Sequence, residues 1–217
     1  MVTVALDTDI EAARPFRDVA TPTHPSLVDP ALLMVELFGI TNVPFGIWVD
    51  ETGTIVRPAE VAFAPRDPRA AEEGAAQQAR FVEQLPPEQQ KVIAEMTKVT
   101  RDTARYASAV RDWVTKGADS EYVLPAAEVI ARSRPCPEGA ARAAAEFEIG
   151  QHLHRAGHKL DAVPHFQAAH RLDPENWSYP RQAYALVDES MGNPYGTDLL
   201  TEVGRVGPAT FYPELTI

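Results

Sequence analysis

The sequence predicts a fold of two parts, an α/β segment at residues 1–58 and an all-helical segment at residues 87–217. The first segment contains short apolar, β-branched runs bounded by turn residues, which are typical of strands. In the second segment apolar residues recur every three or four positions, which is typical of amphipathic helices. Residues 59–86 are rich in Ala, Glu, Gln and Pro and predict a linker or helical insertion, with a helix at Ala70–Gln84.

The first segment predicts the element order β-α-α-β-β. Val2–Leu6 is an apolar, β-branched run and predicts a strand. Asp9 then caps a helix whose apolar residues are spaced three apart. Three prolines predict a loop at Thr21–Pro30, because each disfavours helix just before it. A short helix follows at Ala31–Leu37 and ends at Gly39, where glycine suits a left-handed cap. The apolar positions of the first helix are Ile10, Ala13, Phe16 and Val19.

The end of the first segment predicts a β-hairpin that follows a tight turn. The apolar runs Phe45–Val49 and Thr54–Val56 predict two strands. The four residues Asp50–Gly53 between them fit a hairpin loop that closes on glycine. Immediately before the first strand, Val43 and Pro44 form an X-Pro turn.

The second segment begins with a long amphipathic pattern. From Pro87 to Gly117 the apolar residues follow steps of three, four and seven, which predict one long helix or two helices joined near Thr100. Glycine at position 117 caps this pattern. A shorter helix is predicted near Pro125–Ser133.

Composition and charge narrow the classes of function. The net charge is −11 and no Lys/Arg cluster occurs, which argues against non-specific binding to nucleic acid or to an anionic membrane. No run approaches the roughly 18 apolar residues of a membrane helix, and the acidic N-terminus does not resemble a signal peptide. We therefore expect an acidic, cytoplasmic protein. The single cysteine excludes an intrachain disulfide and a cysteine-based metal cage.

Residues 143–176 carry a repeat-like pattern. Seven positions of a 34-residue unit that starts at Ala143 hold Ile149, Gly150, Leu153, Ala162, Phe166, Ala169 and Pro174. These residues resemble the tetratricopeptide repeat, and only Glu146, at the position usually held by tryptophan, departs from it. The resemblance implies two packed helices, near Ala143–Arg155 and Leu160–Leu172, and a concave face that binds peptides or proteins. One repeat cannot bury its own apolar face, so we expect neighbours at residues 87–133 and 177–189.

Residues 2–58 resemble the thioredoxin-like redoxins, in particular thiol reductases of the cytochrome-maturation type and the alkyl-hydroperoxide-reductase group. Three stretches carry the resemblance: Val2–Asp7, Phe38–Pro44 and Gly46–Val56. It implies that the Val43–Pro44 peptide bond is cis. It also implies that the backbone of residues 42–44 (Asn42, Val43 and Pro44) holds an extended peptide.

The cysteines of that family have no counterpart in this sequence. No Cys-x-x-Cys occurs, and the strand and helix that would carry it would lie before Met1. Dithiol exchange needs an attacking thiolate and a resolving partner, so the resemblance implies a degenerate active site without catalytic residues. We favour the explanation that the chain is a fragment or begins at an internal Met. In the alternatives, another subunit completes the sheet in a homo-oligomer, or Val2–Leu6 moves inward.

Other chemistry-bearing residues fit structural roles better than catalytic or metal-binding ones. Cys136 is the one candidate thiol, but it lies between two prolines with no helix N-terminus aimed at it. His152 and His154 lie about 200° apart on a helix and cannot converge on a metal. His158 follows Gly157, where that helix ends. We expect no metal and no cofactor.

These observations favour a non-catalytic protein that mediates protein interaction. The expected partner is a protein or peptide, bound at the Val43–Pro44 turn, at the helical repeat, or at both. The alternative is a thiol-disulfide oxidoreductase or a peroxidase-type redoxin whose active cysteines lie upstream of this chain or on a partner.

Overall fold

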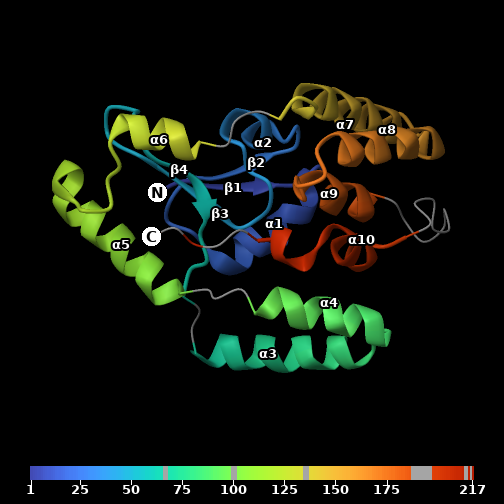
Figure 1. Ribbon diagram of the computed structural model, residues 1–217, viewed down its shortest axis with the longest axis horizontal. Helices are drawn as coiled ribbons and strands as arrows, with labels where there is room; N and C mark the ends of the chain where they lie inside the picture. Colours follow the sequence, from blue (N-terminus) through green and yellow to red (C-terminus); the bar gives the residue numbers. More distant parts are fainter. Residues whose placement is uncertain (66–67, 99–101, 134–136, 187–196, 213–214, 216) are drawn as a thin grey trace. The chain divides into compact units, whose positions relative to one another are not determined.

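A computed structural model describes the chain except residues 66–67, 99–101, 134–136, 187–196, 213–214 and 216. The chain forms two compact units, each made of two stretches of sequence. Unit 1 comprises residues 1–41 and 135–197, and unit 2 comprises residues 42–134 and 198–217. The boundary after Thr41 falls inside the predicted α/β segment, so both units contain strands and helices (Figure 1).

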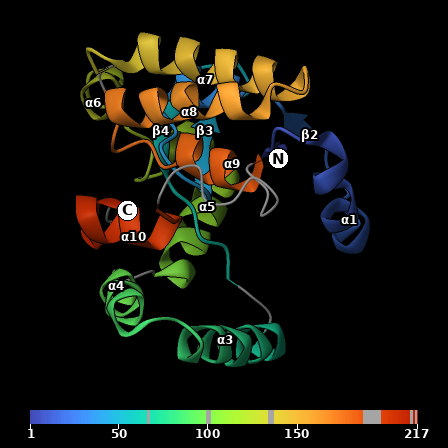
Figure 2. The same ribbon diagram turned by 90° about the vertical axis from the view of Figure 1, so that its right-hand side faces the viewer.

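Unit 1 begins with a strand, a helix and a second strand. The strands β1 (Thr3–Leu6) and β2 (Ser26–Asp29) pair in parallel, with Thr3 opposite Ser26. Between them lies α1 (Ile10–Ala20), which Asp9 caps as predicted by accepting a hydrogen bond from the N–H of Glu11. Figure 2 shows α1 alongside β2.

The strand β2 corrects the prediction of a loop at Thr21–Pro30. The prolines lie outside its four residues, so none of them removes a donor from the β1–β2 pairing. Pro25 supports the pairing, because its carbonyl oxygen accepts the N–H of Thr3 at 3.0 Å. After β2, the Asp29 carboxylate accepts the N–H of Met34 at 2.8 Å, in the first turn of α2 (Leu33–Phe38). That helix ends at Gly39 with φ 65°, which confirms the left-handed cap.

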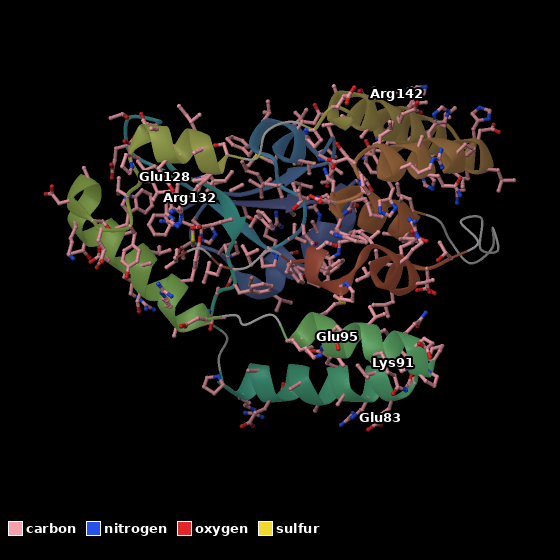
Figure 3. The ribbon with its side chains drawn as sticks, viewed as in Figure 1. Glu83, Lys91, Glu95, Glu128, Arg132 and Arg142 are labelled. Carbon is pink, nitrogen blue, oxygen red and sulfur yellow. The ribbon has the colours of Figure 1, made fainter. Side chains whose placement is uncertain are left out.

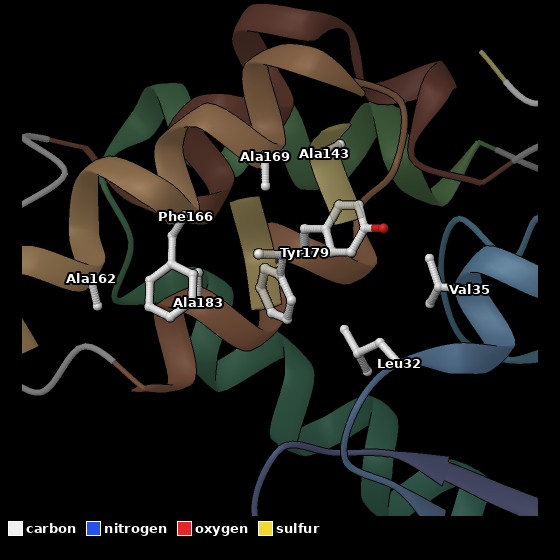
Figure 4. Packing of buried hydrophobic residues seen from close by; sticks show 9 residues of the cluster. Leu32, Val35, Ala143, Ala162, Phe166, Ala169, Tyr179 and Ala183 are labelled. Atoms are coloured by element: carbon white, nitrogen blue, oxygen red, sulfur yellow. The ribbon is translucent and has the colours of Figure 1, made fainter. Parts of the chain in front are cut away.

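The rest of unit 1 is helical. A tight turn at Gly157, with φ 89°, joins α7 (Ala140–Arg155) and α8 (Lys159–Leu172) into a helical hairpin, and α9 (Ser178–Leu186) packs against α8. Gly150 permits the close approach of the two helices, because a Cβ there would lie 2.6 Å from the ring of Phe166. Figure 4 shows the core around this contact. Its buried members are Leu32, Val35, Ala143, Phe147, Ala162, Phe166, Ala169, Tyr179 and Ala183.

Unit 2 contains the predicted hairpin. The strands β3 (Phe45–Val49) and β4 (Ile55–Val61) are antiparallel, and the N–H of Gly53 bonds to the carbonyl of Asp50 in the loop between them. The second strand is longer than the predicted Thr54–Val56. Pro58 does not end it, because a strand at the edge of a two-stranded sheet tolerates a missing donor.

The helices of unit 2 between residues 68 and 132 follow the predicted pattern closely, whereas no helix was predicted at residues 199–206. The long amphipathic stretch forms two helices, as one of the two predicted alternatives had it, and Gly117 follows the second with φ 58°. The described α-helices are α3 (Pro68–Glu83), α4 (Pro87–Thr97), α5 (Thr103–Lys116), α6 (Ala126–Arg132) and α10 (Leu199–Val206). Short 3-10 helices occupy Gly117–Asp119 and Pro208–Thr210.

The core of unit 2 gathers around Trp48. Its indole stacks on Trp113 with ring centroids 5.0 Å apart, and its N–H donates to the hydroxyl of Tyr106 at 3.1 Å. Ile217, near the end of the chain, is buried in the same cluster. Burial raises the pKa of Tyr106, whose hydroxyl lies in this cluster.

Candidate functional site

The Val43–Pro44 peptide bond is cis, which confirms the expectation from the family resemblance. The backbone around it takes its hydrogen bonds from within unit 2. The Val43 carbonyl accepts from the hydroxyl of Tyr212 at 3.0 Å, and the Val43 N–H donates to the side chain of Asn42 at 2.9 Å. Asn42 is fully buried and donates in turn to the carbonyl of Phe211 at 2.6 Å.

The predicted docking turn is therefore held by the C-terminal segment of the chain itself. A peptide that bound to the Val43 carbonyl would have to displace the hydroxyl of Tyr212. Sequence reasoning missed Phe211 and Tyr212, because they lie 169 residues from the groups that they contact. Peptide docking at this turn stays a prediction.

The residues of the repeat-like pattern lie together in the helical hairpin, and most of them are core residues. Ala162, Phe166 and Ala169 are at most 1% exposed, and Leu153 packs against the same cluster. Ile149 and Pro174 are exposed. Where the pattern departs from a tetratricopeptide repeat, the structure gives Glu146 a polar partner on the other helix. Its carboxylate lies 2.8 Å from Nδ1 of His165. These contacts explain the packing of the hairpin and do not themselves form a binding site.

The histidines of the hairpin have separate surroundings. Nε2 of His154 lies 3.0 Å from the carbonyl of Leu186, and Nδ1 of His158 lies 3.8 Å from the Asp161 carboxylate. Among the described residues, no three His, Cys, Asp or Glu side chains are arranged to hold a metal ion. The predicted thiol, Cys136, lies outside the described residues.

A different surface, in unit 1, has the features of a binding site. A pocket of about 480 Å³ lies between β1, α1 and β2, and we call it the α1 groove. Most of its lining residues are apolar, and it touches three consecutive residues of each strand. Apolar side chains that contribute to it from the three elements are Val4, Ile10, Ala13, Phe16, Leu27 and Val28.

The helix beside the groove is exposed on its apolar face. Not one residue of α1 is buried, although its apolar positions have the spacing of a packed face. Phe16 is 79% exposed and Val19, one helical turn further on, is 88% exposed. The three-residue spacing in the sequence predicts an apolar face on this helix. It does not indicate whether that face is buried against the same chain or exposed for a partner. Only the structure shows that the described part of unit 1 leaves the face open.

The ionisable side chains that line the groove are all basic. Among the described lining residues these are Arg14, Arg17 and His24. The guanidinium of Arg14 lies 2.8 Å from the Glu11 carboxylate, and its hydrogen bond lowers the pKa of Glu11. Arg17 pairs in the same way with Asp18. Both pairs are exposed, as is the pair of Glu128 with Arg132 on α6 in Figure 3.

The comparisons with known proteins give no family for this chain. No protein-family profile matches it, and no curated protein or solved structure shows significant similarity to it. Across the described part of the chain, none of the helices combines the length and the apolar character needed to cross a membrane. The function therefore has to be argued from the surfaces themselves.

Proposed function

We propose that this chain is a non-catalytic protein that mediates protein interaction, and that it binds its partner through the α1 groove. The observation that carries the proposal is the exposed apolar face of α1, with Phe16 at 79% exposure beside a largely apolar groove. Amphipathic helices normally bury such a face, and a contiguous exposed apolar patch marks an interaction site.

The sequence resemblances support the same class of function. Residues 2–58 resemble thioredoxin-like proteins but carry no Cys-x-x-Cys, which favours a retained binding role over catalysis. Residues 143–176 resemble a tetratricopeptide unit, a class of helical repeat that binds peptides or proteins. The parallel pairing of β1 and β2 adds a physical argument, because sheets of parallel strands are normally covered on both faces.

A selection of random peptides displayed on phage tests the proposal. Phe16→Glu places a charge on the open apolar face, at a side chain that is 79% exposed, on a helix with no buried residue. Covering a phenylalanine side chain is worth about 1.5–3 kcal/mol, so we expect the variant to weaken the selected peptides by about ten-fold or more. Phe81→Glu is the matched control, because Phe81 also lies on a helix, α3 of unit 2, and is 52% exposed.

We expect the three proteins to differ only in peptide binding. The wild-type chain and Phe81→Glu enrich the same peptides, and Phe16→Glu does not, while far-UV circular dichroism shows equal helix content in all three. If the wild-type chain enriches no peptide, or if Phe16→Glu enriches the same peptides as well as wild type does, the proposed function is wrong.

A further inference from the structure

We infer that the occupant of the α1 groove is an extended, apolar segment of a partner protein that carries carboxylate side chains. The inference rests on the proposed function and names the chemistry of the partner. Three features of the groove support it: the two strands that line it, the sign of its charges and its size.

The two strands that line the groove each have an open edge to which an extended segment can pair. Among the described residues, β1 and β2 form a sheet of two strands, so each strand has one neighbour and one open edge. Thr3–Ala5 and residues 26–28 line the groove, so an occupant of the groove lies beside both strands. Strand addition to an open sheet edge is a common mode of peptide recognition.

The charges of the groove favour an acidic occupant. The whole chain has a net charge of −11, yet the described ionisable residues of the groove are the basic Arg14, Arg17 and His24. A carboxylate on the partner would meet cations there, and a guanidinium can hold it through two parallel hydrogen bonds. An apolar segment with basic residues would meet like charges in the same place.

The ion pairs that Arg14 and Arg17 already form do not prevent either arginine from binding a carboxylate of the partner. The side chains of Arg14 and Glu11 are 50% and 69% exposed, and those of Arg17 and Asp18 are 47% and 56% exposed. Exposed pairs of this kind are weak, because water screens both charges. Either arginine can therefore turn from its present carboxylate to one on the partner.

The volume of the groove sets the length of the segment. At about 480 Å³ it lies within the range of about 300–1,000 Å³ that is usual for clefts holding small ligands. It therefore accommodates a few side chains of a short segment. Residues of the partner beyond that segment would lie outside the groove.

Two synthetic peptides test the inference. Both contain the apolar core Val-Ile-Phe, and the residues on either side of that core are Glu in the first peptide and Lys in the second. Fluorescence anisotropy of labelled peptides measures both dissociation constants at low and high salt. We expect the Glu peptide to bind the wild-type chain at least about ten-fold tighter than the Lys peptide, with a preference that shrinks as salt is added.

Charge reversal shows where the preference arises. The double variant Arg14→Glu, Arg17→Glu should prefer the Lys peptide, whereas Arg69→Glu, Arg80→Glu should keep the preference of the wild-type chain. The second double variant is the matched control, because both of its arginines are exposed on α3 of unit 2. Equal affinity of the wild-type chain for the two peptides, or binding of neither, overturns the inference.

The two proposals can fail separately. If the phage selection enriches peptides that depend on Phe16 but lack acidic residues, the proposed function stands and the inference is wrong. If nothing is enriched, the proposed function itself is wrong. Two further results would assign the groove to another occupant and overturn the inference. One is Phe16-dependent binding to phosphatidylserine vesicles without peptide binding, and the other is a wild-type dimer in sedimentation that Phe16→Glu dissociates.

Discussion

Arg57 and Glu60 of β4 form a buried ion pair, and Glu60→Gln tests what that pair contributes to unit 2. The two side chains are 3% and 9% exposed. Nε and one terminal nitrogen of Arg57 donate to the two carboxylate oxygens at 2.9 and 3.0 Å, and the other terminal nitrogen donates to the carbonyl of Tyr122 at 2.9 Å. The guanidinium also lies 5.4 Å from the ring of Trp48.

The expected cost of the substitution follows from this burial. Glutamine keeps one acceptor oxygen but presents an NH₂ group to the second guanidinium donor, and it leaves a buried cation without its counter-charge. Removing one partner of a buried pair costs about 3–5 kcal/mol, and because one hydrogen bond survives we expect about 3 kcal/mol. Glu128→Gln is the control. It changes the same chemistry in the exposed pair with Arg132, where a loss of about 0.3–0.5 kcal/mol is expected (Figure 3).

Urea unfolding followed by tryptophan fluorescence measures the stability of both variants. The signal reports on unit 2, because Trp48 and Trp113 stack in the core beside the ion pair. With a slope of about 1–3 kcal/mol/M, a loss of 3 kcal/mol lowers the unfolding midpoint by about 1–3 M. Replacing both partners, with Arg57→Met and Glu60→Leu together, should restore most of the loss. If Glu60→Gln lowers the midpoint no more than Glu128→Gln does, the reasoning from burial is refuted.

Three further predictions concern the cores and the turn. Burial raises the pKa of Tyr106 above 10.0. As the pH rises past about 10 the unfolded chain therefore loses this proton first, and the free energy of unfolding falls until the raised pKa is passed. Tyr106→Phe should make urea midpoints fall less steeply over that range, and an unchanged slope would contradict the assignment. Tyr212→Phe removes the hydrogen bond to the Val43 carbonyl and should cost about 0.5–1.5 kcal/mol in urea unfolding, whereas an unchanged midpoint would show that the bond contributes nothing. Phe166 is 1% exposed, so Phe166→Ala should lower the stability of the α7–α8 hairpin by about 3–5 kcal/mol, and a loss below about 1 kcal/mol would exclude the packing described for it.

Local chemistry made several elements of the fold predictable. Asp9 caps α1, Gly39 takes a left-handed conformation at the end of α2, and Gly117 has a positive φ at the end of α5, because such caps depend on neighbouring residues alone. The hairpin loop that begins at Asp50 is local in the same sense. The two helices around Gly157 were implied by the match of residues 143–176 to a 34-residue repeat, and the structure confirms both helices.

Pairing over distance was not predictable in the same way. The strand β2 has four residues and lies among prolines, so its sequence indicated a loop. It is a strand because β1 offers it a parallel partner across the whole of α1. A strand that depends on a distant partner leaves little trace in its own residues.

The candidate sites also combine features that local sequence predicts with features that depend on distant segments. The sequence by itself determined the apolar face of α1 and the absence of a Cys-x-x-Cys, because each depends on residues adjacent in the chain or on the same helix, while the cis bond at Val43–Pro44 was expected from a family resemblance and is confirmed. Tertiary structure alone decided that Tyr212 bonds to the turn and that the described part of unit 1 leaves the face of α1 open, beside a groove whose ionisable side chains are basic. The physical reason is that local sequence sets which faces are apolar, whereas the packing of distant segments sets which of those faces are covered.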